Sequence, residues 1–369
     1  MRFAFVHEWL IEYGGSEKVL ERCLSIAPEA PIYTIIYDEK KFTHSPIADH
    51  QVHTSFIQRL PFRKHFRMYL PLMPMAIERF DVGDVDVVIS SNHCVAKGIL
   101  TRSDQLHISY VHAPMRYAWD LHFPIMEQAH LRHGLRGLFA SWIFKDLRRW
   151  DVLAANRVDV FVANSKYVAR RIRKVYRRDA QVIYPPVDVG RFKPDQDRDD
   201  FYLTVCRCVP YKHVEMMVMA FNRLGRPLVV IGDGPELERI KRIANPHIKM
   251  MGWQSDPVVV DHMQRCRAFI NASDEDFGIA PVEAQAAGAP VIAYGRGGTG
   301  ETVLHGVTGV HFQKQTIEHI VAAVKEFEND PTRFDAARIH EHAMQFDASH
   351  FDSQMRQLID RQWSEFTAS

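Results

Sequence analysis

The stretch NASDEDFGIAPVEAQAAGAP, residues 271–290, decides the fold class. Asn271 ends a run of β-forming residues, a loop with Gly278 follows, and Pro281 is well placed as the first residue of a helix. Gly288 and Pro290 end that helix and begin the next buried strand. The free amides and dipole of the helix start favour an anion, most naturally a diphosphate. The stretch therefore predicts a strand–helix–strand unit of an α/β sheet with an anion at the helix start.

Two glutamates of this stretch are candidate ligands. Glu275 lies in the loop and Glu283 in the expected first helical turn, so their carboxylates can point into one cleft from opposite sides of the anion. We expect Glu275 to hold hydroxyls of a sugar and Glu283 those of a ribose. Each glutamate alone also fits a plainer role, as a solvated loop charge or a complement to the helix dipole.

The rest of the chain repeats the alternation of short apolar runs and helical segments, which is typical of parallel sheets covered by helices on both faces. The expected strands of the first half are Phe3–His7, Ile32–Tyr37, Val85–Ser90, His107–His112 and Val158–Asn164, and its helices include Ser16–Ala27 and Lys166–Tyr176. The expected strands of the second half are Phe201–Val205, Pro227–Ile231, Ile248–Met251, Ala268–Asn271, Pro290–Tyr294 and Gly309–Phe312. Its expected helices are His213–Leu224, Pro235–Ala244, Asp256–Arg265, Pro281–Gly288 and Gln315–Asn329.

A chain of 369 residues suits two such domains better than one. Pro185 and Pro186 make a stiff connection, so we expect one Rossmann-like domain over residues 1–184 and a second over 185–349. An amphipathic helix at about 350–369 is expected to pack back toward the first domain. Residues 1–185 carry 26 Lys and Arg against 19 Asp and Glu, whereas the remainder is acidic, which also favours two domains.

A second anion-binding candidate is TVCRCVPYKHVE, residues 204–215. Arg207 ends a strand and Lys212 begins a helix, where a cation opposes the helix dipole unless an anion lies between the two side chains. These donors would stabilise a departing diphosphate. The plainer alternative is a pair of surface charges beside a turn.

Glycine turns and one histidine complete the candidate site. Gly14 and Gly15 follow the first strand, and Gly232 and Gly234 follow a strand of the second half, where the missing side chains let backbone approach a ligand. All lie at carboxyl ends of strands, where ligands of such sheets bind. His112 ends another strand and could reach a sugar or an acceptor, although among 20 histidines a structural role is equally plausible.

Several function classes are disfavoured. No apolar run approaches the ~20 residues of a membrane span, and the first strand is too short for a signal-peptide core. The five scattered cysteines indicate reduced thiols of the cytosol, and Cys206 with Cys208 has no second pair that would complete a metal site. The basic first half lacks the aromatic platform expected of a nucleic-acid-binding domain.

In combination these motifs resemble the family-4 retaining glycosyltransferases of GT-B architecture, in which a deep cleft separates two Rossmann-like domains. The resemblance spans nearly the whole chain and rests on the motifs in their order: Gly14-Gly15, HAPMRY at 112–117, Asn164-Ser165, PPVD at 185–188, Arg207 with Lys212, and the Glu275/Glu283 pair. Cys206 and His213 depart from the usual residues beside the arginine and the lysine.

The resemblance implies a hexosyltransferase that needs neither metal nor cofactor and retains anomeric configuration. It implies that Arg207 and Lys212 bind the donor diphosphate, Glu275 the donor sugar and Glu283 the ribose. It further implies that Gly15 lies on the phosphate side and His112 near the sugar. The backbone of Phe277, Gly278, Ile279 and Ala280 is expected to line the donor.

VHEWL at 6–10 and HAPMRYAWD at 112–120 are similar to enzymes of bacterial surface-polysaccharide assembly. This similarity implies GDP-mannose as the leading donor, with UDP- or dTDP-sugars as alternatives, and a lipid-linked or polysaccharide acceptor. A nucleotide-sugar-binding protein without catalysis is the rival hypothesis.

Two basic amphipathic segments, Arg59–Arg67 and Arg132–Arg149, suggest peripheral contact with anionic lipid. The expected location is therefore the cytoplasm, at the inner face of the plasma membrane. Ordinary solvated helix faces packed against a core remain the alternative.

Overall fold

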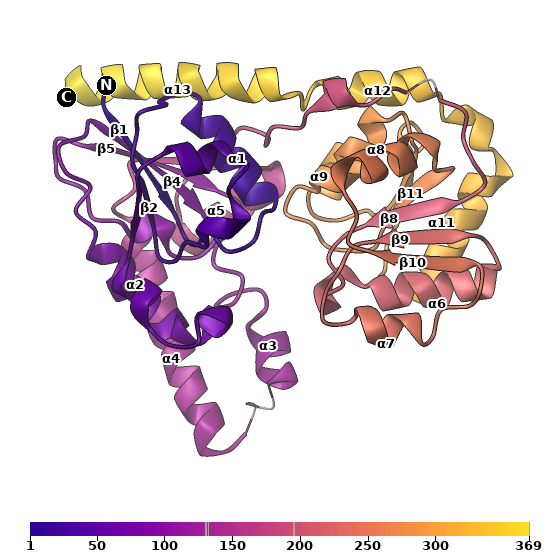
Figure 1. Cartoon of the computed structure of the whole chain (residues 1–369), viewed down its shortest axis with the longest axis horizontal. Helices are drawn as coiled ribbons and strands as arrows, with labels where there is room; N and C mark the ends of the chain where they lie inside the picture. Colours follow the sequence, from indigo (N-terminus) through magenta and orange to yellow (C-terminus); the bar gives the residue numbers. More distant parts are fainter. Residues whose placement is uncertain (130, 132, 195, 369) are drawn as a thin grey trace. The chain divides into compact units, whose positions relative to one another are not determined.

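The computed structural model describes residues 1–129, 131, 133–194 and 196–368 and, of these, leaves the side chains of Arg63, Lys64 and Gln128 undescribed. The chain forms two compact units (Figure 1). Unit 1 comprises Met1–Tyr184 and Asp352–Ser369, and unit 2 comprises Pro185–Phe351.

Unit 1 is built on a seven-stranded sheet in the order β3-β2-β1-β4-β5-β6-β7, and its described strand pairs are parallel. The strands are β1 (Phe3–His7), β2 (Ile32–Thr34), β3 (Val52–Thr54), β4 (Val87–Asn92), β5 (Leu106–Val111), β6 (Val160–Ala163) and β7 (Gln181–Val182). Every residue of β4 and β5 is buried, as expected for central strands covered on both faces.

The helices of unit 1 connect these strands. They are α1 (Gly15–Leu24), α2 (Met73–Glu78), α3 (His122–Gln128), α4 (Gly134–Ala155) and α5 (Lys166–Tyr176), with short 3-10 helices between them. The long helix α13 (Ala348–Ala368) ends the chain, and from Asp352 onward it belongs to unit 1, where Arg22 Nε donates to Asp352 Oδ1 at 2.7 Å.

Unit 2 is built on a six-stranded parallel sheet in the order β10-β9-β8-β11-β12-β13. The strands are β8 (Tyr202–Val205), β9 (Leu228–Ile231), β10 (Ile248–Gly252), β11 (Ala268–Asn271), β12 (Val291–Tyr294) and β13 (Gly309–Phe312). The helices are α6 (Val214–Leu224), α7 (Leu237–Lys241), α8 (Asp256–Arg265), α9 (Ile279–Ala286), α10 (Thr299–Thr302), α11 (Ile317–Asn329) and α12 (Ala336–Met344).

The expected α/β class with two parallel sheets is confirmed, and most elements lie within two residues of their expected bounds. Differences arise where backbone pairing stops. The expected strand Ile32–Tyr37 ends at Thr34, and the pairing resumes only as a bridge between Leu10 and Tyr37. The expected strand Val85–Ser90 instead continues through Ser91 to Asn92, because the backbone of β5 pairs with these polar residues.

The length and apolarity of the helices bear on whether any of them could cross a membrane. Within the described parts of the chain, no helix is both long enough and apolar enough to cross a bilayer.

A buried ion pair fixes α4 to the short 3-10 helix Ala96–Gly98 that follows β4. Lys97 and Asp151 have fully buried side chains and are hydrogen-bonded to each other. Asp151 also accepts from Trp119 Nε1 at 2.8 Å, and the Lys97 ammonium lies 5.1 Å from the centre of the Tyr176 ring. Each buried charge is therefore compensated by the other and by neighbouring polar groups.

We expect Lys97→Met to lower the free energy of unfolding by about 3–5 kcal/mol, because it leaves Asp151 charged and buried without its cation. Urea unfolding measures the loss. The double variant Lys97→Met/Asp151→Leu should recover much of it, since no lone charge remains. Arg102→Ala, at an exposed ion pair, is the control and should cost no more than about 1 kcal/mol. Equal stability of Lys97→Met and the wild type would contradict this account.

Candidate functional site

The candidate residues of unit 2 gather at the point where its strand order reverses. From β8 the chain continues to β9 and β10 on one side, whereas β11 is followed by β12 and β13 on the other. The segments that follow β8 and β11 therefore leave adjacent strands in opposite directions. Such a switch point, at the carboxyl ends of the strands, is where ligands of open α/β sheets bind.

Lys212 and Glu275 meet at this point. Lys212 ends a short 3-10 helix after β8, Glu275 lies in the loop after β11, and Nζ is 2.6 Å from Oε1. Ser273 Oγ donates to the same carboxylate oxygen at 2.5 Å. Burial of the ammonium favours its neutral form, but the Glu275 carboxylate outweighs this effect, so the pKa of Lys212 is raised above its ordinary value. Lys212 is thus held as a cation beside an anionic partner.

The helix after this loop begins earlier than expected. Gly278 has φ +93°, α9 starts at Ile279, and the amide of Val282 donates to the carbonyl of Gly278 at 3.3 Å. Pro281 is therefore the third helical residue, not the first, a position that still requires no intrahelical donor. The amides of Ile279 and Ala280 precede the first intrahelical bond and belong to the positive end of the helix dipole.

This shift moves Glu283 out of the first turn, contrary to expectation. It is the fifth residue of α9 and is buried, and its Oε1 lies 2.6 Å from Arg191 Nη2. Arg191 also bonds Asp256 through Nη1 at 2.6 Å. Sequence reasoning missed Arg191, whose only signal is its place just after the proline-rich connection.

The packing of the surrounding backbone explains why glycines occupy two positions that were predicted to approach a ligand. Gly232 and Gly234 have φ of +140° and +154°. A Cβ atom at Gly232 would lie 1.9 Å from the carbonyl oxygen of Cys206, and one at Gly234 would lie 2.4 Å from that of Cys208. The two loops also share a bond from the amide of Cys208 to the carbonyl of Asp233 at 2.8 Å. The glycines thus hold the segment that carries the exposed Arg207.

A glycine-rich loop that sequence reasoning missed supports Glu275. The amide of Gly298 donates to the carbonyl of Glu275 at 2.7 Å, and Gly297 forms a β-bridge with Glu275. A Cβ atom at Gly297 would lie 2.3 Å from the Glu275 carbonyl oxygen. Only glycine permits this approach, so RGGTG at 296–300 is the signal that could have identified the loop.

Phe277, by contrast, is a core residue. Its side chain is buried and its ring lies 5.5 Å from that of Phe346. Burial of the ring leaves the backbone as the part of Phe277 that could contact a ligand, and the expectation for the backbone of Phe277–Ala280 stays a prediction.

The strand order of unit 1 reverses between β1 and β4, and Gly14 and Gly15 follow β1. His112 follows β5, and its Nε2 is 2.8 Å from the hydroxyl of Ser91. The same hydroxyl is 3.0 Å from His7 Nδ1, and His7 Nε2 is 3.2 Å from Glu17 Oε1. Sequence reasoning predicted His112 but missed these three partners.

Gly14 and Gly15 introduce the helix that carries Glu17. Gly14 precedes α1 with φ −156°, an extended conformation open to any residue, and Gly15 is the first helical residue. A Cβ atom at Gly14 would lie 3.3 Å from Glu17 Oε2, so a side chain there would crowd this carboxylate. The structure thus brings Gly14 close to the polar cluster of unit 1.

Burial sets the charge states of this cluster. Burial lowers the pKa of His112 to about 3, and the nearby His93 acts in the same direction. Burial opposes the charge of Glu17, but its bond to His7 outweighs this and lowers the pKa of Glu17. His112 is therefore neutral and Glu17 ionised at neutral pH.

A second carboxylate–imidazole pair adjoins the cluster. Glu8 is fully buried, and its Oε1 accepts hydrogen bonds from the amides of His93, Cys94 and Ala96 at 2.7–3.2 Å. Its other oxygen is 3.0 Å from His93 Nδ1. Burial opposes ionisation of Glu8, but these partners outweigh it and lower its pKa. The segment after β4, which follows Ser91, is thereby held in place.

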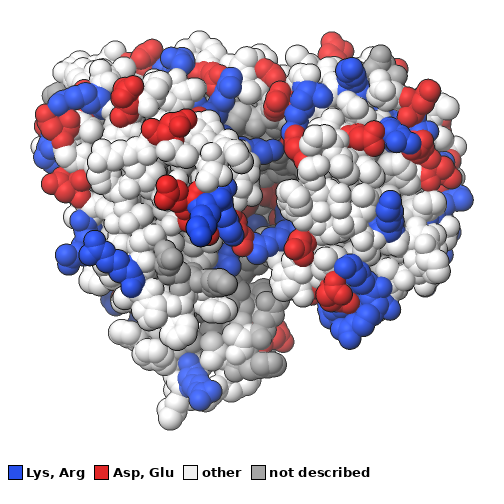
Figure 2. Space-filling model, viewed as in Figure 1, with Lys and Arg blue, Asp and Glu red and all other residues white. Residues whose placement is uncertain are grey.

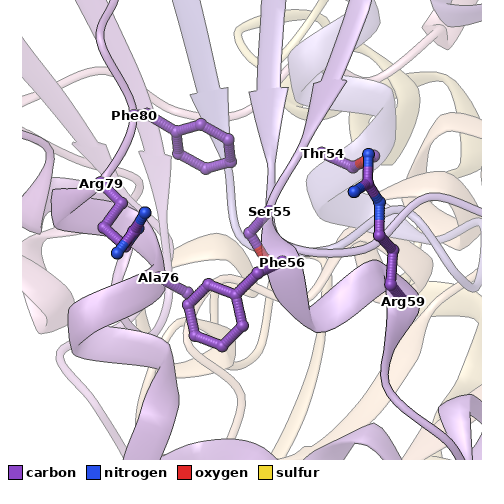
Figure 3. Close-up of a pocket in the computed structure, with 7 residues that line it drawn as sticks. All are labelled: Thr54, Ser55, Phe56, Arg59, Ala76, Arg79 and Phe80. Atoms are coloured by element: carbon purple, nitrogen blue, oxygen red, sulfur yellow. The ribbon is translucent and has the colours of Figure 1, made fainter.

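Unit 1 also contains a cavity of about 270 Å³ beyond the end of β3 (Figure 3). Arg59 and Arg79 line it, together with Thr54, Ser55, Phe56, Ala76 and Phe80. Among the described side chains, no carboxylate pairs with either arginine. Two unneutralised guanidinium groups at one cavity suit an anionic group such as phosphate.

The first half of α4 presents an apolar stripe to solvent. Leu135, Leu138, Phe139 and Trp142 are 62–85% exposed and follow the i, i+3, i+4, i+7 spacing of one helix face. In the view of Figure 2, few charged side chains are visible among the described residues at this end of unit 1. Arg136, Lys145 and Arg149 are exposed on the same helix, whereas Arg132 lies outside the described residues. Exposed apolar patches are typical of interaction surfaces.

Two family models match the chain. The model described as Glycosyltransferase Family 4 covers residues 26–191, and the one described as Glycosyl transferases group 1 covers residues 190–346. All predicted site residues of unit 2 lie in the second range.

Curated proteins similar to the chain match it over part of their length. The GDP-mannose-dependent alpha-(1-6)-phosphatidylinositol monomannoside mannosyltransferase of Mycolicibacterium smegmatis is 31% identical over 210 residues, which are 48% of this chain and 55% of the relative. The D-inositol 3-phosphate glycosyltransferase of Rhodococcus erythropolis is 28% identical over 227 residues, 52% of this chain and 51% of the relative. The chain thus spans about half the length of the curated relatives it matches.

Solved structures resemble the whole chain. HepE from Anabaena in complex with UDP has a TM-score of 0.73 at 17% identity, covering 98% of this chain and 100% of that one. Sucrose-phosphate synthase from Thermosynechococcus elongatus has a TM-score of 0.76 at 16% identity, covering 100% of both chains. At these identities the likeness shows the fold.

Buried neutral histidines predict acid sensitivity of unit 1. Burial lowers the pKa of His107 to about 4, whereas histidine in an unfolded chain titrates near ~6.5. As pH falls from about 6.5 to 4, His107 binds a proton in the unfolded chain but not in the folded chain. The free energy of unfolding therefore decreases by up to about 3 kcal/mol. His107→Gln should flatten this decrease in urea unfolding series.

The exposed His44 provides the control, and His44→Gln should keep the pH dependence of the wild type. A His107→Gln variant as acid-sensitive as the wild type would refute this assignment.

Proposed function

Because the chain belongs to the family-4 glycosyltransferases and has their GT-B fold, we propose that it transfers a sugar from a nucleotide sugar to an acceptor hydroxyl with retention of anomeric configuration. The observation that carries this proposal is the contact of Lys212 with Glu275 at the switch point of unit 2. A cation for phosphate and a carboxylate for sugar hydroxyls there fit the two halves of a nucleotide sugar.

In the proposed reaction, unit 2 binds the donor. Lys212, the guanidinium of Arg207 and the amides at the start of α9 stabilise the negative charge that develops on the departing diphosphate. Glu275 accepts hydrogen bonds from the sugar, and Glu283, oriented by Arg191, accepts from the ribose. In unit 1, His112 contacts a sugar or acceptor hydroxyl, and Gly15 adjoins the phosphates.

GDP-mannose is the donor we propose first. Its support is the similarity to mannosyltransferases that use GDP-mannose, and the alternative is a UDP-sugar, since structures of the same fold have been solved with UDP. Thermal unfolding with GDP, UDP and dTDP separates these donors. The nucleotide that binds the folded chain raises the midpoint in a concentration-dependent way.

We expect Lys212→Ala and Glu275→Ala each to lower kcat about 10²–10³-fold, because each removes a group that contacts the reacting part of the donor. Transfer of radiolabelled sugar to a glycolipid measures turnover. Lys241→Ala, at an exposed Lys–Glu pair of the same unit, is the matched control and should retain activity. Lys212→Arg keeps the charge and should lose less than Lys212→Ala.

Thermal unfolding of each variant separates loss of function from loss of fold. Wild-type turnover in folded Lys212→Ala and Glu275→Ala would remove the site assignment. Tight nucleotide binding without any product would instead favour a non-catalytic nucleotide-sugar-binding protein.

The acceptor we propose is lipid-linked or a growing bacterial surface glycan, presented at the inner face of the plasma membrane. The exposed stripe on α4 would enter the lipid interface, with nearby Lys and Arg side chains at anionic headgroups. The arginine-lined cavity of unit 1 supports an acceptor that carries phosphate. The basic segment Arg59–Arg67 contributes Arg59 to this cavity.

We expect the chain to float with liposomes that contain anionic lipid and Trp142→Asp to reduce the bound fraction several-fold, because a carboxylate opposes insertion at an anionic interface. Trp253→Asp is the matched control, since Trp253 is 75% exposed but belongs to unit 2. Absence of flotation at low salt would reject the membrane proposal. A Trp142-dependent dimer in light scattering would assign the stripe to a second copy of the chain instead.

A further inference from the structure

Four polar side chains of unit 1 form one continuous hydrogen-bonded chain from Glu17 to His112. Glu17 lies on α1, His7 ends β1, Ser91 lies near the end of β4 and His112 follows β5. The three links measure 3.2, 3.0 and 2.8 Å. His7, Ser91 and Glu17 are at most 5% exposed, whereas His112 is partly exposed. The buried hydrogen-bonded chain thus ends at one partly exposed residue.

The donors and acceptors of this chain follow from its buried end. An ionised carboxylate only accepts hydrogen bonds, so His7 Nε2 carries the proton toward Glu17. A His7 ring that carries only this proton leaves Nδ1 bare, so that Nδ1 accepts from the Ser91 hydroxyl. The Ser91 oxygen in turn accepts from His112 Nε2–H. Since burial lowers the pKa of His112 to about 3, its ring is neutral and its Nδ1 carries no proton.

We propose that Glu17, His7 and Ser91 are positioning residues that fix His112 as the tautomer protonated on Nε2, so that its Nδ1 accepts a hydrogen bond from a substrate hydroxyl. The ligand chemistry that this assigns to His112 is a hydroxyl donor, such as a sugar or an alcohol acceptor, rather than a phosphate or carboxylate oxygen. The inference rests on the proposed function only where activity is the readout.

The surroundings of the His112 ring also favour Nδ1 as the nitrogen that contacts a ligand. No described residue hydrogen-bonds His112 Nδ1, whereas Nε2 is engaged by Ser91. The backbone of His112 is held on both sides, because its amide donates to the carbonyl of Asn92 at 2.8 Å and its carbonyl accepts from Asn164 Nδ2 at 3.0 Å. A fixed backbone and a bonded Nε2 leave Nδ1 as the nitrogen presented to a ligand.

A matched pair on the same strand separates this role from ordinary packing. Ser90 precedes Ser91 on β4 and bonds His107 Nε2 at 2.9 Å, a Ser–His contact of the same kind. Ser90 and His107 are both fully buried, so this pair faces the core instead of a ligand. Ser90→Ala therefore removes the same bond from the same strand without touching the chain to His112.

The first test is ¹⁵N NMR of histidine-labelled protein between pH 6 and 8, with the His112 signals assigned from His112→Gln. We expect His112 Nε2 to be protonated and Nδ1 unprotonated throughout. Ser91→Ala should shift the His112 signals toward a mixture of tautomers, whereas Ser90→Ala should shift those of His107 alone. A protonated Nδ1 in the wild type, or unchanged His112 signals in Ser91→Ala, would overturn the proposal.

The second test is turnover. We expect Ser91→Ala to lower kcat/KM about ten-fold, the size of one hydrogen bond lost from a positioned group, and Ser91→Thr to restore most of it. Ser90→Ala should leave kcat/KM near that of the wild type. If no glycosyl transfer is found while the ¹⁵N pattern holds, the proposed function fails and the tautomer assignment stands. An equal loss of kcat/KM in Ser90→Ala and Ser91→Ala would show that the hydrogen-bonded chain from Glu17 to His112 contributes only to folding.

Discussion

The arrangement of this protein depends on one topological constraint, the reversal of strand order within each parallel sheet. Where the order reverses, successive crossovers leave on opposite sides, and polar groups at the carboxyl ends are not covered by a connection. Unit 1 places His7 and Ser91 on the two strands that flank its switch point, and unit 2 places Lys212 and Glu275 after the corresponding strands. The backbone topology thus creates a polar site in each unit.

Close backbone packing then makes these sites rigid. The loop of Glu275 is held by a bridge to Gly297, and the loop of Arg207 packs against Gly232 and Gly234, at distances that exclude any Cβ atom. Because these contacts join backbone to backbone, the candidate side chains are positioned by the close packing of one loop against another. Such support reduces the entropy that a site loses when it orders around substrate.

Local patterns in the sequence predicted the described strands except β3 and β7, most helices and the residues that lie at strand ends, since these follow from short-range periodicity and punctuation. They did not predict which residues meet. Lys212 and Glu275 are 63 positions apart, and Glu283 finds Arg191 at a separation of 92. These pairings depend on strand order, which periodicity does not encode. The early start of α9 was missed because Pro281 also fits the third helical position.

The pairing of charges in unit 2 bears on which ligands the site selects. A simple phosphate that approaches Lys212 must also approach the Glu275 carboxylate 2.6 Å away, and like charges repel at that distance. A ligand that offers hydroxyl donors to Glu275 and phosphate oxygens to Lys212 hydrogen-bonds both side chains and leaves neither charge without a partner. Under the proposed function, the contact between Lys212 and Glu275 therefore favours a ligand in which sugar and diphosphate are joined over one that brings phosphate alone.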